Sequence, residues 1–239
     1  MRQILLYLLI IIIFMELFYV TEGFFDKINK LDFNNIKIVE LDNKNPLYCF
    51  KNYCLHLNND IYSLYDKSTF LTHSRYHKDT KECDFGYINT ILKIYPQNIN
   101  NVCIFGFGLG GLPLALSKNN NIIKIDCIDI DMKMFELFKT INQNPPKKIN
   151  YYLNDVNDYI KHSDQKYDMI VDDTYAAEKI IVDYSLLKNM LNSNGVLFIN
   201  IINYDASIKL IEELKKIYTN VSHQKANYNY LITCYRGSD

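Results

Sequence analysis

The sequence predicts an α/β protein whose main domain is a parallel sheet covered by helices on both faces. Apolar, β-branched segments alternate with amphipathic segments from residue 101 onward, which is the pattern of strands buried on both sides. A glycine-rich turn follows the first of these strands. Apolar residues make up 49% and charged residues 22% of the 239 residues, a composition that excludes a disordered chain.

The N-terminal segment, residues 1–23, is expected to be a secretory signal peptide. Arg2 precedes an apolar run over residues 4–20, and small residues at positions 21 and 23 suit cleavage before Phe24. The run is also just long enough to span a bilayer as an uncleaved anchor. We therefore expect a secreted or lumenal protein. Membrane anchoring by residues 4–20 is the alternative, and it applies only if the leader is not cleaved.

A small β-rich region is predicted over residues 24–82. Short apolar or alternating segments, separated by turns that carry Asn and Asp, indicate strands within residues 36–65. Residues 66–82 are polar and are predicted to form a loop.

Six cysteines fit an oxidising compartment. Three of them are expected to be buried free thiols within core strands: Cys103, Cys127 and Cys234. If the chain forms a disulfide, it is expected among the other three, with the pairing open: Cys49, Cys54 and Cys83. The spacing of these three matches no zinc signature.

The Rossmann-like main domain is predicted over residues 83–239, opening with a helix at 84–94. Its strands are expected at residues 102–105, 122–130, 149–153, 167–171, 195–202 and 228–235. Its later helices are expected at residues 112–118, 132–141, 156–161, 182–191 and 206–217. Because parallel strands end at the same edge of a sheet, the residues that follow them should share one crevice.

A glycine-rich turn, FGFGLGG, joins the first strand of this domain to its helix. Gly106 permits the tight turn, Gly108 lets a ligand approach the backbone, and Gly110 and Gly111 bring the helix close. Placed at the first strand-to-helix turn, the segment indicates a nucleotide- or nucleoside-binding loop. The alternative is a turn built for packing alone.

Acidic residues follow the next three strands. Asp129 is placed to accept hydrogen bonds from ribose hydroxyls, whereas Asp131 is expected to cap the following helix. Asp155 can accept from an adenine amino group or serve as a helix N-cap. Of the adjacent Asp172 and Asp173, one is expected to point into the crevice and the other to support the loop.

These residues resemble the spermidine/spermine synthase group of aminopropyltransferases, within the class I S-adenosylmethionine-dependent methyltransferase fold. FGFGLGG is similar to the group's glycine motif. Asp129, Asp155 and Asp173 fall on its ribose-binding acid, its adenine-contacting Asp and the catalytic Asp that helps deprotonate the attacking amine. The resemblance implies S-adenosylmethionine or its decarboxylated form as donor, no metal, and a possible homodimer.

The chain also departs from the group's pattern. Leu109 stands where the synthases carry the Asp that holds the donor's aminopropyl end, and Phe70 stands where they use a Gln. The acidic Tyr-His-Glu pattern that grips polyamines has no counterpart in FGYINTIL, and the loop after Asp173 reads TYAAEK. The expected contacts to adenosine are thus kept, while those to cationic amines are mostly lost.

The expectation is therefore a group transferase that binds S-adenosylmethionine or a related adenosine ligand and acts on an unknown acceptor. A true aminopropyltransferase is one alternative, and a non-catalytic scaffold that retains the fold is another. A net charge of −1 supplies no basic excess to neutralise phosphates, so nucleic acid is not an expected partner.

Overall fold

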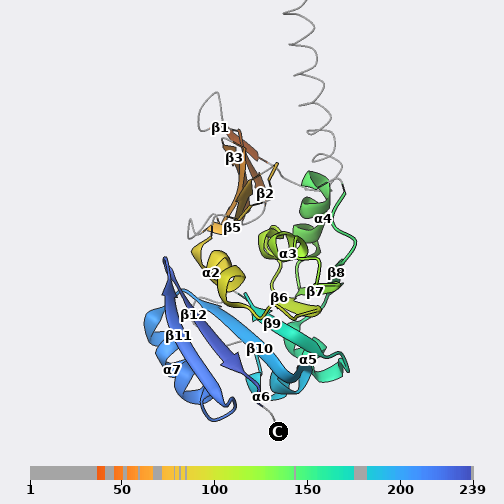
Figure 1. Cartoon of the computed structure of the whole chain (residues 1–239). Coiled ribbons are helices and arrows are strands. Elements are labelled where there is room, and N and C mark those ends of the chain that lie inside the picture. Colours follow the sequence, from red (N-terminus) through yellow and green to blue (C-terminus); the bar gives the residue numbers. More distant parts are fainter. Residues whose placement is uncertain are drawn as a thin grey trace, which may run out of the picture.

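The computed structural model describes two sheets and the helices packed on them (Figure 1). The described residues are 37–40, 46–50, 53–58, 60–66, 72–77, 79–80, 82–83, 85–142, 144–174 and 182–237. The predicted leader, with its cleavage position and the apolar run at 4–20, lies outside them. None of the helices in the described ranges is long and apolar enough to cross a membrane.

The smaller sheet is antiparallel, with its strands in sequence order. It consists of β1 (Lys37–Glu40), β2 (Pro46–Phe50), β3 (Tyr53–Asn58), β4 (Ile61–Asp66) and β5 (Thr72–His77). The prediction of a loop over residues 66–82 is therefore wrong, because β5 lies within that range. Buried Ser74 and Tyr76 alternate with more exposed neighbours there, and one small polar residue on the inner face masks the period of two.

The cysteines follow the prediction. Cys54 is disulfide-bonded, and its register partner across β2 and β3 is Cys49. The remaining cysteines are buried free thiols: Cys83, Cys103, Cys127 and Cys234. Cys83, one of the three candidates for the disulfide, instead donates its thiol hydrogen to the Arg75 carbonyl oxygen at 3.1 Å.

The larger sheet has the strand order β11-β12-β10-β9-β6-β7-β8. Its strands are β6 (Asn101–Phe105), β7 (Lys124–Asp129), β8 (Ile149–Leu153), β9 (Tyr167–Asp172), β10 (Leu191–Ile201), β11 (Asn220–Ala226) and β12 (Asn229–Tyr235). The segment from β6 to β10 is parallel, as predicted.

The C-terminal edge of this sheet differs from the prediction. β12 lies between β10 and β11 and is antiparallel to both, so the sheet is mixed. β11 was not predicted, because Val221 and Ala226 are its only aliphatic residues and it occupies an exposed edge. The helix predicted at 182–191 is a short helix followed by a 3-10 turn, after which β10 begins at Leu191.

Helices cover both faces of the larger sheet (Figure 1). They are α2 (Gly86–Ile94), α3 (Gly111–Ser117), α4 (Met132–Ile141), α5 (Val156–His162), α6 (Tyr184–Leu187), η1 (Lys188–Met190) and α7 (Tyr204–Leu214). Residues of α2, α3, α4 and the smaller sheet share one apolar core, and residues of α5, α6 and α7 share the other. Alternation along β6 explains this, because Ile104 faces the first core and Phe105 the second.

Candidate functional site

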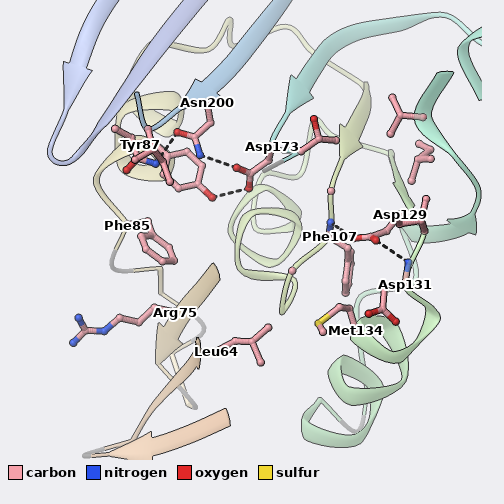
Figure 2. Close-up of a pocket in the computed structure, with 18 of the residues that line it drawn as sticks. Leu64, Arg75, Phe85, Tyr87, Phe107, Asp129, Asp131, Met134, Asp173 and Asn200 are labelled. Carbon is pink, nitrogen blue, oxygen red and sulfur yellow. Dashed lines mark hydrogen bonds between the residues drawn. The ribbon is translucent and has the colours of Figure 1, made fainter. Parts of the chain in front are cut away.

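A cavity of about 660 Å³ lies at the carboxyl ends of the parallel strands (Figure 2). The glycine-rich turn and the residues after β7 and β9 form one side of it. The smaller sheet, the start of α2, the turn between β11 and β12 and residues at the ends of β8 and β10 also line it. The parallel strands thus bring the acids that follow them to one crevice, as an open α/β sheet requires.

The four glycines of the turn divide into two roles. Gly106 and Gly108 line the cavity and have positive φ values of 84° and 51°. Gly110, at φ 78°, is the N-cap of α3, and a Cβ there would lie 2.5 Å from the Phe138 ring. Gly111 is the buried first residue of α3. The first pair is therefore positioned for a ligand, and the second pair serves close packing.

Asp129 ties the glycine-rich turn to the end of β7 and lines the cavity. Its carboxylate accepts hydrogen bonds from the backbone N–H of Phe107 at 2.7 Å and of Asp131 at 2.9 Å. Burial raises its pKa, which these backbone bonds oppose. Asp131 caps α4 as predicted, accepting from the N–H of Lys133 at 3.0 Å.

Asp155 lines the cavity but is exposed, and its carboxylate is the N-cap of α5. One of its oxygens accepts from the backbone N–H groups of Asn157 and Asp158, at 2.8 and 3.2 Å. The capping role that the sequence allowed is therefore present. Adenine recognition by Asp155 stays a prediction.

Asp172 and Asp173 separate as expected. Asp172 is buried, where it accepts from the hydroxyl groups of Thr174 and Tyr184 at 2.5 and 2.6 Å. Asp173 lines the cavity, and its carboxylate accepts from the Tyr87 hydroxyl at 2.7 Å and the Asn200 amide at 2.8 Å (Figure 2). Burial raises the pKa of Asp173 to about 6, against the lowering effect of these two bonds. A carboxylate with this pKa can accept a proton near neutral pH.

Tyr87 and Asn200 are site residues that the sequence analysis missed. Tyr87 belongs to the segment FGYINTIL, in which the polyamine-binding Tyr-His-Glu pattern has no counterpart. It lies 86 residues before Asp173, and no local pattern joins residues so far apart. Asn200 is the last residue but one of β10, where the rule that ligands bind at the carboxyl ends of strands could have found it.

The residues that depart from the synthase pattern lie in different places. Leu109 is fully buried in the core and does not line the cavity. Phe70 and the loop segment 175–180 lie outside the described residues. Across the described ranges, no group of three or more His, Cys, Asp or Glu side chains could hold a metal ion.

The fold and the cavity together define an α/β protein of the Rossmann-like, methyltransferase type, with a small antiparallel sheet added at its N-terminal side. The family follows from the sequence. The spermine/spermidine synthase domain matches residues 85–237, so the chain belongs to the spermine/spermidine synthase family.

Known relatives agree with this assignment. The chain is 27% identical over 123 residues to a polyamine aminopropyltransferase of Clostridium perfringens, a match that covers 48% of this chain and 44% of the relative. It is 28% identical over 125 residues to that of Alkaliphilus metalliredigens, covering 48% and 43%. The matches thus span less than half the length of these curated relatives.

Solved structures show the fold. A probable spermidine synthase from Corynebacterium glutamicum has a TM-score of 0.62 at 10% identity, covering 84% of this chain and 80% of its own. Spermidine synthase from Thermotoga maritima has a TM-score of 0.58 at 14% identity, covering 87% and 74%. Human methyltransferase-like protein 13, in complex with SAH, has a TM-score of 0.52 at 20% identity, covering 64% and 76%.

Proposed function

We propose that this chain is an aminopropyltransferase that uses decarboxylated S-adenosylmethionine, with Asp173 as the base. This activity is the alternative given in the sequence analysis. The relatives named polyamine aminopropyltransferase favour it over a group transferase with an unknown acceptor. The observation that carries the proposal is the Asp173 carboxylate, which faces the cavity while Tyr87 and Asn200 fix both of its oxygens.

In the proposed reaction, the acceptor nitrogen attacks the aminopropyl carbon that is bonded to the sulfonium. The new C–N bond forms as the C–S bond breaks, and the electron pair of that bond goes to sulfur, leaving methylthioadenosine. The proton lost by the acceptor amine passes to Asp173. With a pKa of about 6, this group is mostly ionised at pH 7 and yet basic enough to take the proton.

The nucleoside would lie along the glycine-rich turn. Gly106 and Gly108 leave the backbone accessible there, and Asp129 stands beside them at the end of β7. Asp129 already accepts two backbone N–H groups, and the other lone pairs of a carboxylate can accept ribose hydroxyls. Asp173 lies on the other side of the same turn, since its N–H donates to the Phe105 carbonyl oxygen at 2.8 Å.

A second candidate function is supported by Leu109, which is buried in the core and brings no carboxylate to the cavity. A donor ammonium in a water-excluded site needs a paired charge, and Leu109 supplies none where the synthases carry an Asp. This favours a donor whose ammonium has its own carboxylate beside it, as in S-adenosylmethionine, and hence transfer of another group from that donor.

The charges that line the cavity bear on which acceptor would bind there. Arg75 is the only Lys or Arg among the described residues that line it, and its guanidinium points away from Asp129 and Asp131 (Figure 2). Four carboxylates line the cavity against this one guanidinium, and such an excess of negative charge favours a cationic acceptor. The acceptors tested should therefore include diamines, with an amine that carries a carboxylate as the contrast.

The test combines binding and product analysis. Calorimetry compares S-adenosylmethionine, its decarboxylated form and methylthioadenosine, and mass spectrometry follows transfer to putrescine, spermidine and γ-aminobutyrate. We expect an aminopropylated amine, with the rate reduced by about 100-fold or more in Asp173→Asn while methylthioadenosine binding is kept. Methyl transfer without aminopropyl transfer would favour the second candidate, and binding without any transfer would favour a scaffold.

A further inference from the structure

A chain of side-chain hydrogen bonds leads from the turn between β11 and β12 to Asp173. The Asn229 amide nitrogen donates to the Asn200 side-chain oxygen at 2.8 Å. The Asn200 amide nitrogen in turn donates to Asp173 Oδ1 at 2.8 Å. Tyr87 donates to the other oxygen, Oδ2, at 2.7 Å.

The middle member of this chain, Asn200, could face Asp173 in two ways. The oxygen and nitrogen ends of an asparagine amide are nearly equal in size, so its partners decide which end faces which group. Because Asn229 donates to the oxygen end, the NH₂ end of Asn200 is turned toward Asp173. A donor at that position favours the ionised carboxylate, and a carbonyl oxygen would disfavour it.

The turn that precedes Asn229 packs against the start of α2. Asn229 opens β12 immediately after this turn, in which Asn227 has a φ of 60°. The Asn227 side chain lies over Gly86, so closely that a Cβ on Gly86 would be 2.3 Å from the Asn227 amide nitrogen. Gly86 begins α2, the helix that carries Tyr87. The turn is therefore seated on the helix that supplies the second partner of Asp173.

We propose that Asn229 is a positioning residue, which fixes the amide orientation of Asn200 and thereby keeps Asp173 ionised and held at the cavity. The ionisation of Asp173 does not depend on the reaction it serves, whereas the consequence for turnover rests on the proposed function. The titratable groups that act on this carboxyl are Tyr87, from α2, and Asp172, from β9. Asn200, from β10, is uncharged.

The first variant, Asn229→Asp, exchanges the donor for acceptor oxygens with little change of shape. Asn200 then turns its NH₂ group toward the new carboxylate and presents its oxygen to Asp173. Asn227→Asp is the matched control, because it adds the same charge in the same turn without a hydrogen bond to Asn200. Asn229→Leu removes the donor without adding charge.

The measurement is a ¹³C NMR titration of labelled aspartate carboxyl groups in the ligand-free protein, assigned with Asp173→Asn. We expect Asn229→Asp to raise the proton affinity of Asp173 about tenfold or more, Asn229→Leu to raise it in the same direction, and Asn227→Asp to change it by less than half as much. Circular dichroism verifies that each variant is folded. If Asn229→Asp does not fold, Asn229→Leu still tests the inference.

Equal effects of the two aspartate variants, or no effect of Asn229→Leu, would overturn the inference. This result is distinguishable from failure of the proposed function, because the titration needs no substrate. If transfer occurs, the acidic limb of the rate profile should move to higher pH in Asn229→Asp together with the NMR titration. An active enzyme whose limb stays in place would leave the function standing and refute the role of Asn229.

Discussion

Gly106→Ala should lower the stability of the protein more than the addition of a single methyl group suggests. Gly106 has a φ of 84°, a left-handed conformation that costs an L-residue about 1–2 kcal/mol. The added Cβ would also lie 2.5 Å from the Asp173 carbonyl oxygen and 2.9 Å from its carbon. Because these are backbone atoms, the two segments must separate, and such overpacking typically costs about 1–3 kcal/mol. We expect the free energy of unfolding to fall by at least about 2 kcal/mol.

Gly111→Ala is the matched control in the same turn. Gly111 lies at the start of α3, and its added Cβ would be 3.3 Å from the Cys83 sulfur. Only a small movement is needed there, so we expect the free energy of unfolding to change by less than about 1 kcal/mol. Urea unfolding measures the stability of both variants, and calorimetry measures their affinity for methylthioadenosine. If Gly106→Ala matches Gly111→Ala in stability and in affinity, this account of the turn is wrong.

Three further predictions concern the acids and the leader. Asp129→Ala should weaken methylthioadenosine binding at least tenfold, since charge-assisted hydrogen bonds contribute roughly 1.5–3 kcal/mol each. Asp131→Ala should instead lower the free energy of unfolding by about 1 kcal/mol. Equal losses of affinity in the two variants would refute the separate binding and capping roles of these acids. Asp173 has a pKa of about 6 in the folded protein and about 4 when unfolded, so its contribution to stability is lost as pH rises between these values. Urea unfolding against pH should show a smaller loss in Asp173→Asn than in the wild type. We propose that the chain enters the secretory pathway: protein secreted from eukaryotic cells should begin at Phe24, and cytosolic protein with an intact Met1 would contradict this.

The sequence predicted the parallel part of the main sheet well because that part is governed by local patterns. β-branched runs that are buried on both faces mark the strands, and helix 132–141 and strand 149–153 have the predicted bounds. The capping role of Asp131 also followed from local geometry, since an N-cap contacts the backbone only two residues ahead.

The unpredicted parts depend on contacts between distant segments. β11 pairs at an edge with β12, where the sequence needs few apolar residues. The bond from Tyr87 to Asp173 depends on how α2 packs against the end of β9. The seat of the β11–β12 turn on Gly86 likewise joins residues about 140 positions apart. Such contacts leave no period or motif in a single sequence.

The place of β12 in the sheet also determines when the site is completed during synthesis. Chains grow from the N-terminus and can begin to fold before they are finished. The glycine-rich turn, Asp129 and Asp173 all precede β12, and β12 joins β11 to the rest of the sheet by pairing with both β11 and β10. Until β12 pairs, β10 is an open edge and Asn200 lacks its partner Asn229. A chain truncated before β12 would thus contain Asp173, Tyr87 and Asn200 but lack the donor that orients the Asn200 amide.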